Sequence, residues 1–319
     1  MTTVLGTRVE PARLPRKPTP PPGAGVREEP RAAFERFVRW TIEVERPALE
    51  ISLPPAERSA FADYYRALPA PGEDGAIRRY LRGLWRGEAG WAARWIAGRV
   101  RSGTRPVVLD AGSGFGTYAM LYATMGAEVV GADLRPDRLE TAARRLRFHH
   151  ERTGAALAVR YARADLTRAW AQDVDLVWVY NALSHIEPLD DFLGAVRRHL
   201  RPLGVLVVGD INGGHPEHLR RLAALRSDVR QVYVAPDGRR HAYAVERTFS
   251  PREMREVMVR NGLRVVHHEL YWGGLGRLPQ PLYAGLLRPL QARWWLAPSH
   301  ARRQLAVAAV RRSGREGAR

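Results

Sequence analysis

Short apolar runs alternate with amphipathic stretches through the middle of the chain. The runs have the length of strands and lie at 107–109, 128–132, 157–163, 173–180, 205–210 and 263–270. Between them, apolar residues recur at the spacing of helices, most clearly after positions 136 and 188. Buried parallel strands read as short apolar runs because helices cover both faces of their sheet. The pattern over 102–270 therefore predicts a doubly wound α/β domain with a mostly parallel sheet.

The two flanking regions have different patterns. Residues 1–30 are rich in proline and contain no apolar run, so we expect a disordered tail. Residues 31–101 carry apolar stripes at helical spacing, interrupted by prolines, which predicts a cap of short helices before the sheet. Residues 271–319 place aromatic and aliphatic residues beside arginines and predict a basic, amphipathic helical extension.

The first apolar run leads into a glycine-rich turn. Asp110 ends the run, and Gly112, Gly114 and Gly116 follow at alternate positions before a helical stretch. Glycine lets the backbone turn tightly and approach a ligand closely, and the start of a helix offers unpaired N–H groups. Asp133 ends the next run, where its carboxylate can accept hydrogen bonds from a ribose diol. This order of elements predicts a nucleotide-type cofactor site.

The residues of the turn separate two classes of cofactor. The dinucleotide fingerprint G-x-G-x-x-G/A is broken, because Thr117 stands at its last position. Asp110 would repel a pyrophosphate but suits a ligand that carries an ammonium and a sulfonium. The stretch DAGSGFG at 110–116 resembles the D/E-x-G-x-G-x-G motif of class I S-adenosylmethionine (SAM) methyltransferases. Another nucleotide and a purely structural glycine turn stay open as alternatives.

The resemblance extends over residues 105–270. It implies a seven-stranded sheet whose last strand is antiparallel, although no seventh strand is evident in the sequence. The segment 181–186 is similar to the N-x-L-x-H-I pattern of small-molecule methyltransferases, quinone-pathway enzymes among them. The turn at 200–204 resembles their L-x-P-G-G pattern except at Leu203, which replaces the usual glycine. We expect this departure to alter the turn without touching the cofactor.

The resemblance also implies roles for individual residues. Asp165 and Leu166 match a family pattern in which a carboxylate accepts from the adenine amino group and the next N–H donates to a ring nitrogen. A solvated aspartate at a strand end is the alternative. Asn181 is expected near the amino acid moiety of the cofactor. The predicted cofactor-binding residues are Asp110, Gly112, Ser113, Gly114, Gly116, Asp133, Leu134, Asp165, Leu166 and Asn181.

Methyl transfer from a sulfonium is an in-line displacement, so the protein mainly positions the nucleophile. Weakly acidic acceptors also need a base. His185 is the first candidate because it lies on the loop expected to face the methyl group, and Glu187 and Tyr180 are weaker candidates. A pocket wall or a hydrogen-bond partner is the alternative role for His185. Adjacent histidines point in different directions, so we expect no metal site.

Composition limits the chemistry further. The chain has no cysteine, which excludes disulfides, thiolate zinc sites, cysteine nucleophiles and radical SAM clusters. Its net charge of +18 comes almost entirely from arginine, since Lys17 is the only lysine. Codon bias, an anionic membrane or substrate, and nucleic acid all remain as explanations. Neither a signal peptide nor an apolar run of spanning length is evident, so we expect a cytoplasmic protein.

The sequence therefore predicts a SAM-dependent methyltransferase acting on O, N or C of a small-molecule or lipid-like acceptor. An RNA methyltransferase and a non-catalytic SAM- or nucleotide-binding protein are the alternatives. Nucleic acid is not the expected partner, because residues 180–183 lack the motif of DNA amino-methyltransferases. An NAD(P)-dependent reductase would need a Tyr-x-x-x-Lys pair, which this chain lacks because Lys17 is its only lysine. Peripheral membrane contact through 271–319 and a homodimer are further expectations.

Overall fold

The computed structural model describes most of the chain between residues 29 and 310. The described residues are 29–168, 170, 172–216, 218, 220, 230–234, 238, 240–244, 247–271 and 303–310. The predicted tail up to residue 28, and most of the predicted C-terminal extension (272–302 and 311–319), lie outside them. No helix in the described ranges is long and apolar enough to cross a membrane.

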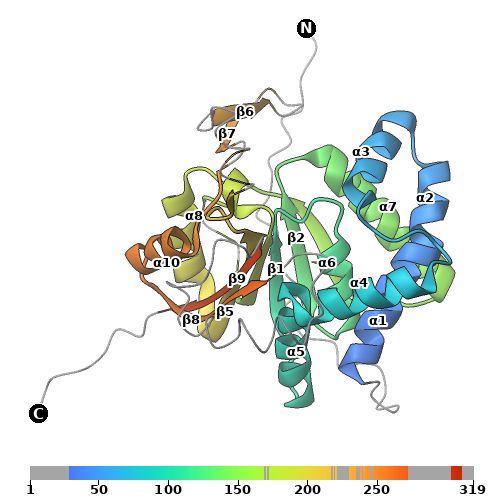
Figure 1. Ribbon diagram of the computed structural model, residues 1–319, viewed down its shortest axis with the longest axis horizontal. Coiled ribbons are helices and arrows are strands. Elements are labelled where there is room, and N and C mark those ends of the chain that lie inside the picture. The colour runs from blue at the N-terminus through green and yellow to red at the C-terminus, as the bar shows by residue number, and fades with distance from the viewer. Residues whose placement is uncertain are drawn as a thin grey trace, which may run out of the picture.

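A mostly parallel sheet forms the centre of the structure, as the alternating pattern predicted (Figure 1). Its order is β3-β2-β1-β4-β5-β9-β8, and the first five strands in that order run parallel to one another. The strands are β1 (Val107–Ala111), β2 (Glu128–Asp133), β3 (Val159–Arg163), β4 (Val174–Tyr180), β5 (Leu200–Ile211), β8 (Leu263–Tyr271) and β9 (Arg303–Val310). The predicted doubly wound α/β fold is therefore confirmed.

The last strand lies where the sequence predicted an amphipathic helix. β9 is inserted between β5 and β8 and pairs antiparallel with both. The side chains from Leu305 to Ala308 are buried, as an interior strand requires. The helical prediction for 303–310 was wrong, because a short apolar run between arginines fits a helix face and a buried strand equally well. These residues supply the seventh strand that was not evident in the sequence.

The predicted cap is helical, and its first and last helices share a core with one face of the sheet (Figure 1). Prolines stand in the first turns of several of them, where the missing N–H costs nothing. Phe34, Ile42 and Ile96 are fully buried in one core with Trp178 of β4 and Val207 of β5. The cap therefore shares its core with the sheet. Its helices are α1 (Pro30–Trp40), the π-helix η1 (Thr41–Glu45), α2 (Arg46–Ser52), α3 (Pro55–Tyr65), α4 (Asp74–Arg86) and α5 (Glu88–Arg101).

The remaining helices complete both faces. α6 (Thr117–Thr124) shares the core of the cap, and α7 (Pro136–Thr153) contacts η1, β2 and β3. On the other face, Phe192 of α8 (Leu189–His199) and Met254 of α10 (Pro251–Arg260) share a second core with β4 and β5. Ser250 and Glu253 form a capping box at the start of α10. β6 (Arg230–Val234) and β7 (Arg240–Ala244) pair as a separate antiparallel hairpin.

The departure at Leu203 has a structural counterpart. Leu203 adopts a positive φ of 65°, a conformation that costs a non-glycine residue roughly 1–2 kcal/mol. Its side chain is 70% exposed and so gains little from burial. The next residue, Gly204, has no room for a side chain, because a Cβ there would lie 2.8 Å from the Asp175 carbonyl oxygen. The turn therefore holds a strained residue at the position where the resemblance predicts glycine.

Candidate active site

A cavity of about 1700 Å³ opens at the carboxyl ends of the parallel strands, which is where open α/β sheets bind their ligands. It extends from the glycine turn to the loop after β4, and the cap helices form part of its wall. Asp110, Ser113 and Gly116 do not line the cavity, although they lie beside residues that do. The predicted site residues that line it are Gly112, Gly114, Asp133, Leu134, Asp165, Leu166, Tyr180, Asn181, His185 and Glu187.

The three glycines of the turn all have positive φ, but they differ in what surrounds them. A Cβ on Gly112 would lie 2.7 Å from the Ala182 Cβ, and one on Gly116 would lie 2.1 Å from the Tyr161 hydroxyl. A Cβ on Gly114 would meet no atom within 4 Å. Packing therefore requires glycine at two positions, whereas Gly114 presents an open side to the cavity, where a ligand can approach the backbone.

Asp133 ties the end of β2 to the glycine turn. Its Oδ2 accepts a hydrogen bond from the Gly114 N–H at 2.9 Å, and its Oδ1 accepts one from the Arg135 N–H at 2.9 Å. An ionised carboxylate offers about four acceptor positions, so each oxygen keeps capacity for a ligand hydroxyl. Asp133 is thus oriented by the backbone, lines the cavity and suits a diol.

Asp110 is buried beneath the turn. Burial raises the pKa of Asp110 to about 8, against the opposing effect of a hydrogen bond from the Ala119 backbone. Its Oδ2 and the Oγ of neighbouring Ser113 are buried without a hydrogen-bond partner in the described residues. Orphaned buried oxygens of this kind are rare in folded proteins. The motif acid therefore lies behind the cavity wall and contacts the start of α6.

Asp165 and Leu166, which follow β3, line another part of the cavity. Asp165 Oδ1 accepts from the Thr167 N–H at 3.1 Å and from the Thr167 hydroxyl at 2.6 Å, and its Oδ2 lies 3.3 Å from Arg168 Nε. These local contacts hold the carboxylate at the cavity wall next to the buried Leu166. The predicted adenine contact would use the remaining acceptor capacity of Asp165.

The loop after β4 brings the three candidate bases together at the cavity. His185, in the short 3₁₀-helix η2 (Leu183–His185), is exposed to the cavity. Glu187 forms an ion pair with Arg247, which holds its carboxylate in place beside a positive charge. Burial raises the pKa of Tyr180, so its hydroxyl stays protonated at neutral pH. Of the three, His185 is the side chain best suited to take a proton.

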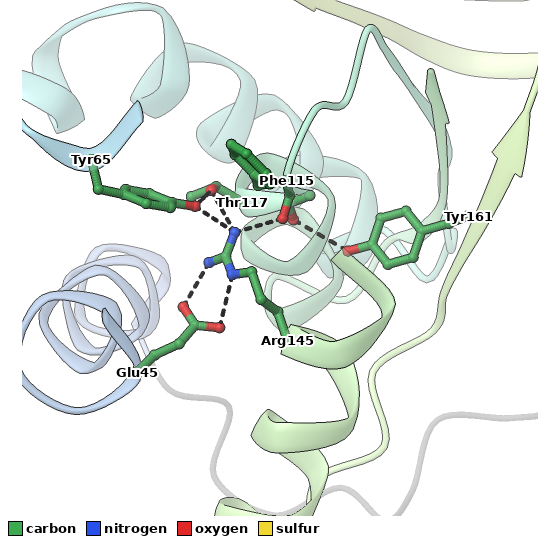
Figure 2. A network of polar contacts seen from close by, with 7 residues as sticks. Glu45, Tyr65, Phe115, Thr117, Arg145 and Tyr161 are labelled. Atoms are coloured by element: carbon green, nitrogen blue, oxygen red, sulfur yellow. Dashed lines mark hydrogen bonds and ion pairs between the residues drawn. The ribbon is translucent and has the colours of Figure 1, made fainter. Parts of the chain in front are cut away.

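Arg145, which the sequence analysis did not single out, fastens the cap to the glycine turn (Figure 2). Its guanidinium is fully buried and forms a bidentate ion pair with Glu45 of η1, at 3.0 Å from Nε and 2.6 Å from Nη2. Its Nη1 donates to the Phe115 carbonyl oxygen at 2.6 Å and to the Thr117 hydroxyl at 2.8 Å. Tyr65 of α3 also accepts from Nη1, so two cap segments and the turn share one arginine.

Arg303 of β9 is the second residue that sequence reasoning missed. Its Nη2 donates to the Asn181 Oδ1 at 2.9 Å, across a separation of 122 residues. Neither arginine carries a local signal, since each is one of 51 basic residues and its partners are distant in the chain. They can be identified only once the three-dimensional arrangement of the strands and helices is known.

Comparisons with known proteins show which proteins this chain is similar to. Residues 109–206 match a family model described as a methyltransferase domain. A ubiquinone biosynthesis O-methyltransferase of Roseobacter denitrificans is 26% identical over 156 residues, which are 49% of this chain and 59% of the relative. One of Cereibacter sphaeroides is 30% identical over 105 residues, 33% of this chain and 41% of the relative. The chain thus spans about half the length of the curated relatives it matches.

Solved methyltransferase structures resemble this chain more distantly. Magnesium protoporphyrin IX methyltransferase of Synechocystis PCC 6803 is 14% identical, with a TM-score of 0.48, over 84% of this chain and 98% of that one. A SAM-dependent methyltransferase of Clostridium acetobutylicum is 14% identical, with a TM-score of 0.49, over 79% of this chain and 98% of that one.

Proposed function

From the premise that this chain carries a class I methyltransferase domain, we propose that it is an enzyme that transfers a methyl group from SAM to a small-molecule acceptor. The observation that carries the proposal is the pairing of Gly114 with Asp133. An open glycine backbone and an oriented carboxylate lie side by side on the cavity wall, at the carboxyl ends of β1 and β2. This is the arrangement that a nucleoside with an attached amino acid requires.

The residues present fit SAM along the whole cavity. Asp133 would accept from the ribose hydroxyls, Asp165 and Leu166 would contact the adenine, and the open side of Gly114 would admit the rest of the cofactor. When bound, SAM supplies a methyl group on a positively charged sulfur. The protein then has to bind the acceptor against that methyl group and exclude water.

The acceptor would lie under the cap. There the cavity is lined by apolar and aromatic side chains from α1, η1, α4 and α6, which suits a planar or apolar molecule. A ring nitrogen of His185 would take the proton of an acceptor hydroxyl as that oxygen displaces the sulfur from the methyl carbon. The residues of this wall are Phe37, Val38, Ile42, Tyr80, Leu84 and Tyr118. Phenolic and quinone-like molecules are the acceptors we propose to test first.

Calorimetric titration of the purified protein with S-adenosylhomocysteine and, in parallel, with NADP tests the cofactor. We expect micromolar binding of S-adenosylhomocysteine and none of NADP. Asp133→Ala should abolish that binding, whereas His185→Ala should bind S-adenosylhomocysteine as the wild type does and lose turnover with a phenolic acceptor. Equal loss of binding in both variants would contradict this division of roles, and NADP binding alone would overturn the cofactor.

We further propose peripheral membrane contact through the sequence 272–302, where Trp294 and Trp295 follow an arginine. Removing the whole C-terminal region would delete β9, so the test uses Trp294→Ala/Trp295→Ala instead. We expect the wild type to float with anionic liposomes and the double variant to stay in the soluble fraction. Equal behaviour of the two would remove this proposal. Analytical ultracentrifugation of the wild type without liposomes measures its molecular mass and tests the expected homodimer.

A further inference from the structure

Arg303 connects three segments beside the loop that follows β4. Its Nη2 donates to the Asn181 Oδ1 and to the Glu88 Oε1, both at 2.9 Å, and its Nε donates to the same Glu88 oxygen at 3.2 Å. Its guanidinium carbon lies 4.8 Å from the centroid of the Tyr180 ring, within the range of a cation–π contact. Tyr180 and Asn181 line the cavity, so a residue near the C-terminus contacts two predicted site residues.

The Arg303 contact is held in place by buried structure. The Glu88 side chain is 5% exposed and that of Arg303 is 17% exposed. Glu88 reaches the sheet only because Gly209 of β5 has no side chain, since a Cβ there would lie 2.5 Å from the Glu88 Cγ. The Gly209 carbonyl oxygen in turn accepts from the Asn181 N–H at 2.9 Å. Helix α5, β5 and β9 therefore fix the guanidinium at one position.

Arg303 decides which way the Asn181 amide faces. A guanidinium has only donors, so Asn181 must present its oxygen to Arg303 and its Nδ2 group must face elsewhere. The Nδ2 group carries two hydrogens, so it can donate to a ligand in the cavity. The backbone of Asn181 is in the left-handed region, with φ at 48°, and the side chain is exposed to the cavity.

We propose that Arg303 is a positioning residue of the active site, which orients the Asn181 amide so that its N–H faces a carboxylate oxygen of the cofactor's amino acid moiety. The assignment rests on the proposed function, because it takes the ligand to be SAM. Arg303 acts through Asn181 and does not itself line the cavity. A neutral amide donor to a carboxylate contributes about 1.5–3 kcal/mol, which corresponds to roughly ten- to a hundredfold in affinity.

The test is a double-mutant cycle on ligand binding. The dissociation constants of S-adenosylhomocysteine and of 5′-methylthioadenosine, which lacks the amino acid moiety, are measured for wild type, Asn181→Ala, Arg303→Lys and the double variant. A lysine ammonium lacks the planar fork with which Arg303 contacts Glu88 and Asn181 together while it stacks on Tyr180. We therefore expect each single variant to bind S-adenosylhomocysteine roughly tenfold more weakly, and the double variant to be no weaker than Asn181→Ala. Binding of 5′-methylthioadenosine should stay unchanged in all four proteins.

Arg201→Lys is the matched control. Arg201 of β5 pairs with the buried Asp175 at 2.9 Å and does not line the cavity, so its replacement should leave both dissociation constants unchanged. Because Arg303→Lys could fail to fold, Glu88→Gln/Arg303→Met is prepared beside it. This variant removes both buried charges together and leaves neither unpaired. It should show the same loss of S-adenosylhomocysteine binding.

Each outcome is informative. Unchanged S-adenosylhomocysteine binding in Arg303→Lys, additive losses in the cycle, or an equal loss of 5′-methylthioadenosine binding would overturn the role of Arg303 while leaving the proposed function intact. Absence of S-adenosylhomocysteine binding in the wild type would instead overturn the proposed function, and the assignment of Arg303 with it. Selective and non-additive loss supports both.

Discussion

Arg145 and Glu45 form a bidentate ion pair in which neither side chain is exposed to solvent (Figure 2). The pair joins α7 to the π-helical segment of the cap across 100 residues of sequence. The same guanidinium donates to the Phe115 carbonyl oxygen within the glycine turn. The position of the cap and the shape of the turn are therefore coupled through one side chain.

Glu45→Gln should lower the free energy of unfolding by about 3–5 kcal/mol, because it leaves the Arg145 guanidinium buried without a counter-charge. Urea unfolding followed by circular dichroism measures this change. Glu35→Gln is the control, since it breaks an exposed pair with Arg31 four residues earlier and should cost no more than about 0.5 kcal/mol.

The double variant Glu45→Gln/Arg145→Met tests whether the uncompensated charge causes the loss. Removing both charges should restore part of the stability lost in Glu45→Gln, because no buried ion is left alone. If the double variant is instead less stable than Glu45→Gln, the cavity left by the shorter methionine side chain outweighs the removal of the charge. Packing would then dominate the stability at this site.

The glycine turn gives a second prediction, in which stability and binding separate. Gly114→Ala should weaken S-adenosylhomocysteine binding at least tenfold, because the new methyl group would occupy the open side that faces the cavity. Its free energy of unfolding should fall by only about 1–2 kcal/mol, the cost of a left-handed alanine. Calorimetric titration and urea unfolding measure the two quantities on the same preparation.

Gly116→Ala should instead lower the free energy of unfolding more than Gly114→Ala does. Its Cβ would collide with the ring of Tyr161, which is also wedged against Gly131. Gly98→Ala, in the middle of a helix with open space around the site, should raise stability by about 0.5–1 kcal/mol. Equal effects of Gly114→Ala and Gly116→Ala on stability would contradict the difference in their surroundings.

Leu203→Gly should stabilise the protein, whereas most substitutions that remove a large side chain destabilise it. The left-handed conformation at position 203 costs leucine roughly 1 kcal/mol, whereas glycine adopts it freely. The leucine side chain is also too exposed for its removal to cost much burial. The gain is reduced by the greater freedom of glycine in the unfolded chain. Thermal unfolding should show a rise of a few degrees, whereas Leu203→Ala should show none because alanine keeps the strain.

The local parts of this site could be predicted from the sequence. The glycine turn and Asp133 lie within one strand–helix–strand unit, so their spacing alone places them together. The loop from Asn181 to Glu187 follows from its place after a strand. Each of these predictions depends on residues within one strand–helix–strand unit or one loop, where periodicity and turn chemistry determine the geometry.

The parts that escaped prediction depend on distant pairing. Arg145 and Arg303 acquire roles only when η1, α5 and β9 dock, and any of the many arginines could have done so. β9 was assigned to a helix because its burial on both faces is a property of its neighbours. The ion pair of Glu187 escaped prediction for the same reason, since Arg247 reaches it from a segment 60 residues away.

Asp110 gives the last prediction, on the dependence of stability on pH. Burial raises its pKa from 3.8 to about 8, so the folded protein favours the neutral acid. Below pH 4 the carboxyl is protonated in both the folded and the unfolded chain, and burial carries no ionic cost. Between pH 4 and pH 8 the unfolded chain releases the proton while the folded protein retains it. Stability should therefore fall by up to about 1.4 kcal/mol per pH unit in that window.

Asp110→Asn removes this titration and leaves every other group in place. The difference in the free energy of unfolding between Asp110→Asn and wild type should therefore grow in favour of the variant as the pH rises from 5 to 8. Urea unfolding at four pH values measures it, and effects of other titrating groups cancel in the difference. A constant difference across this range would mean that the Asp110 carboxyl ionises in the folded protein as it does in the unfolded chain. The raised pKa, and the buried environment that causes it, would then be wrong.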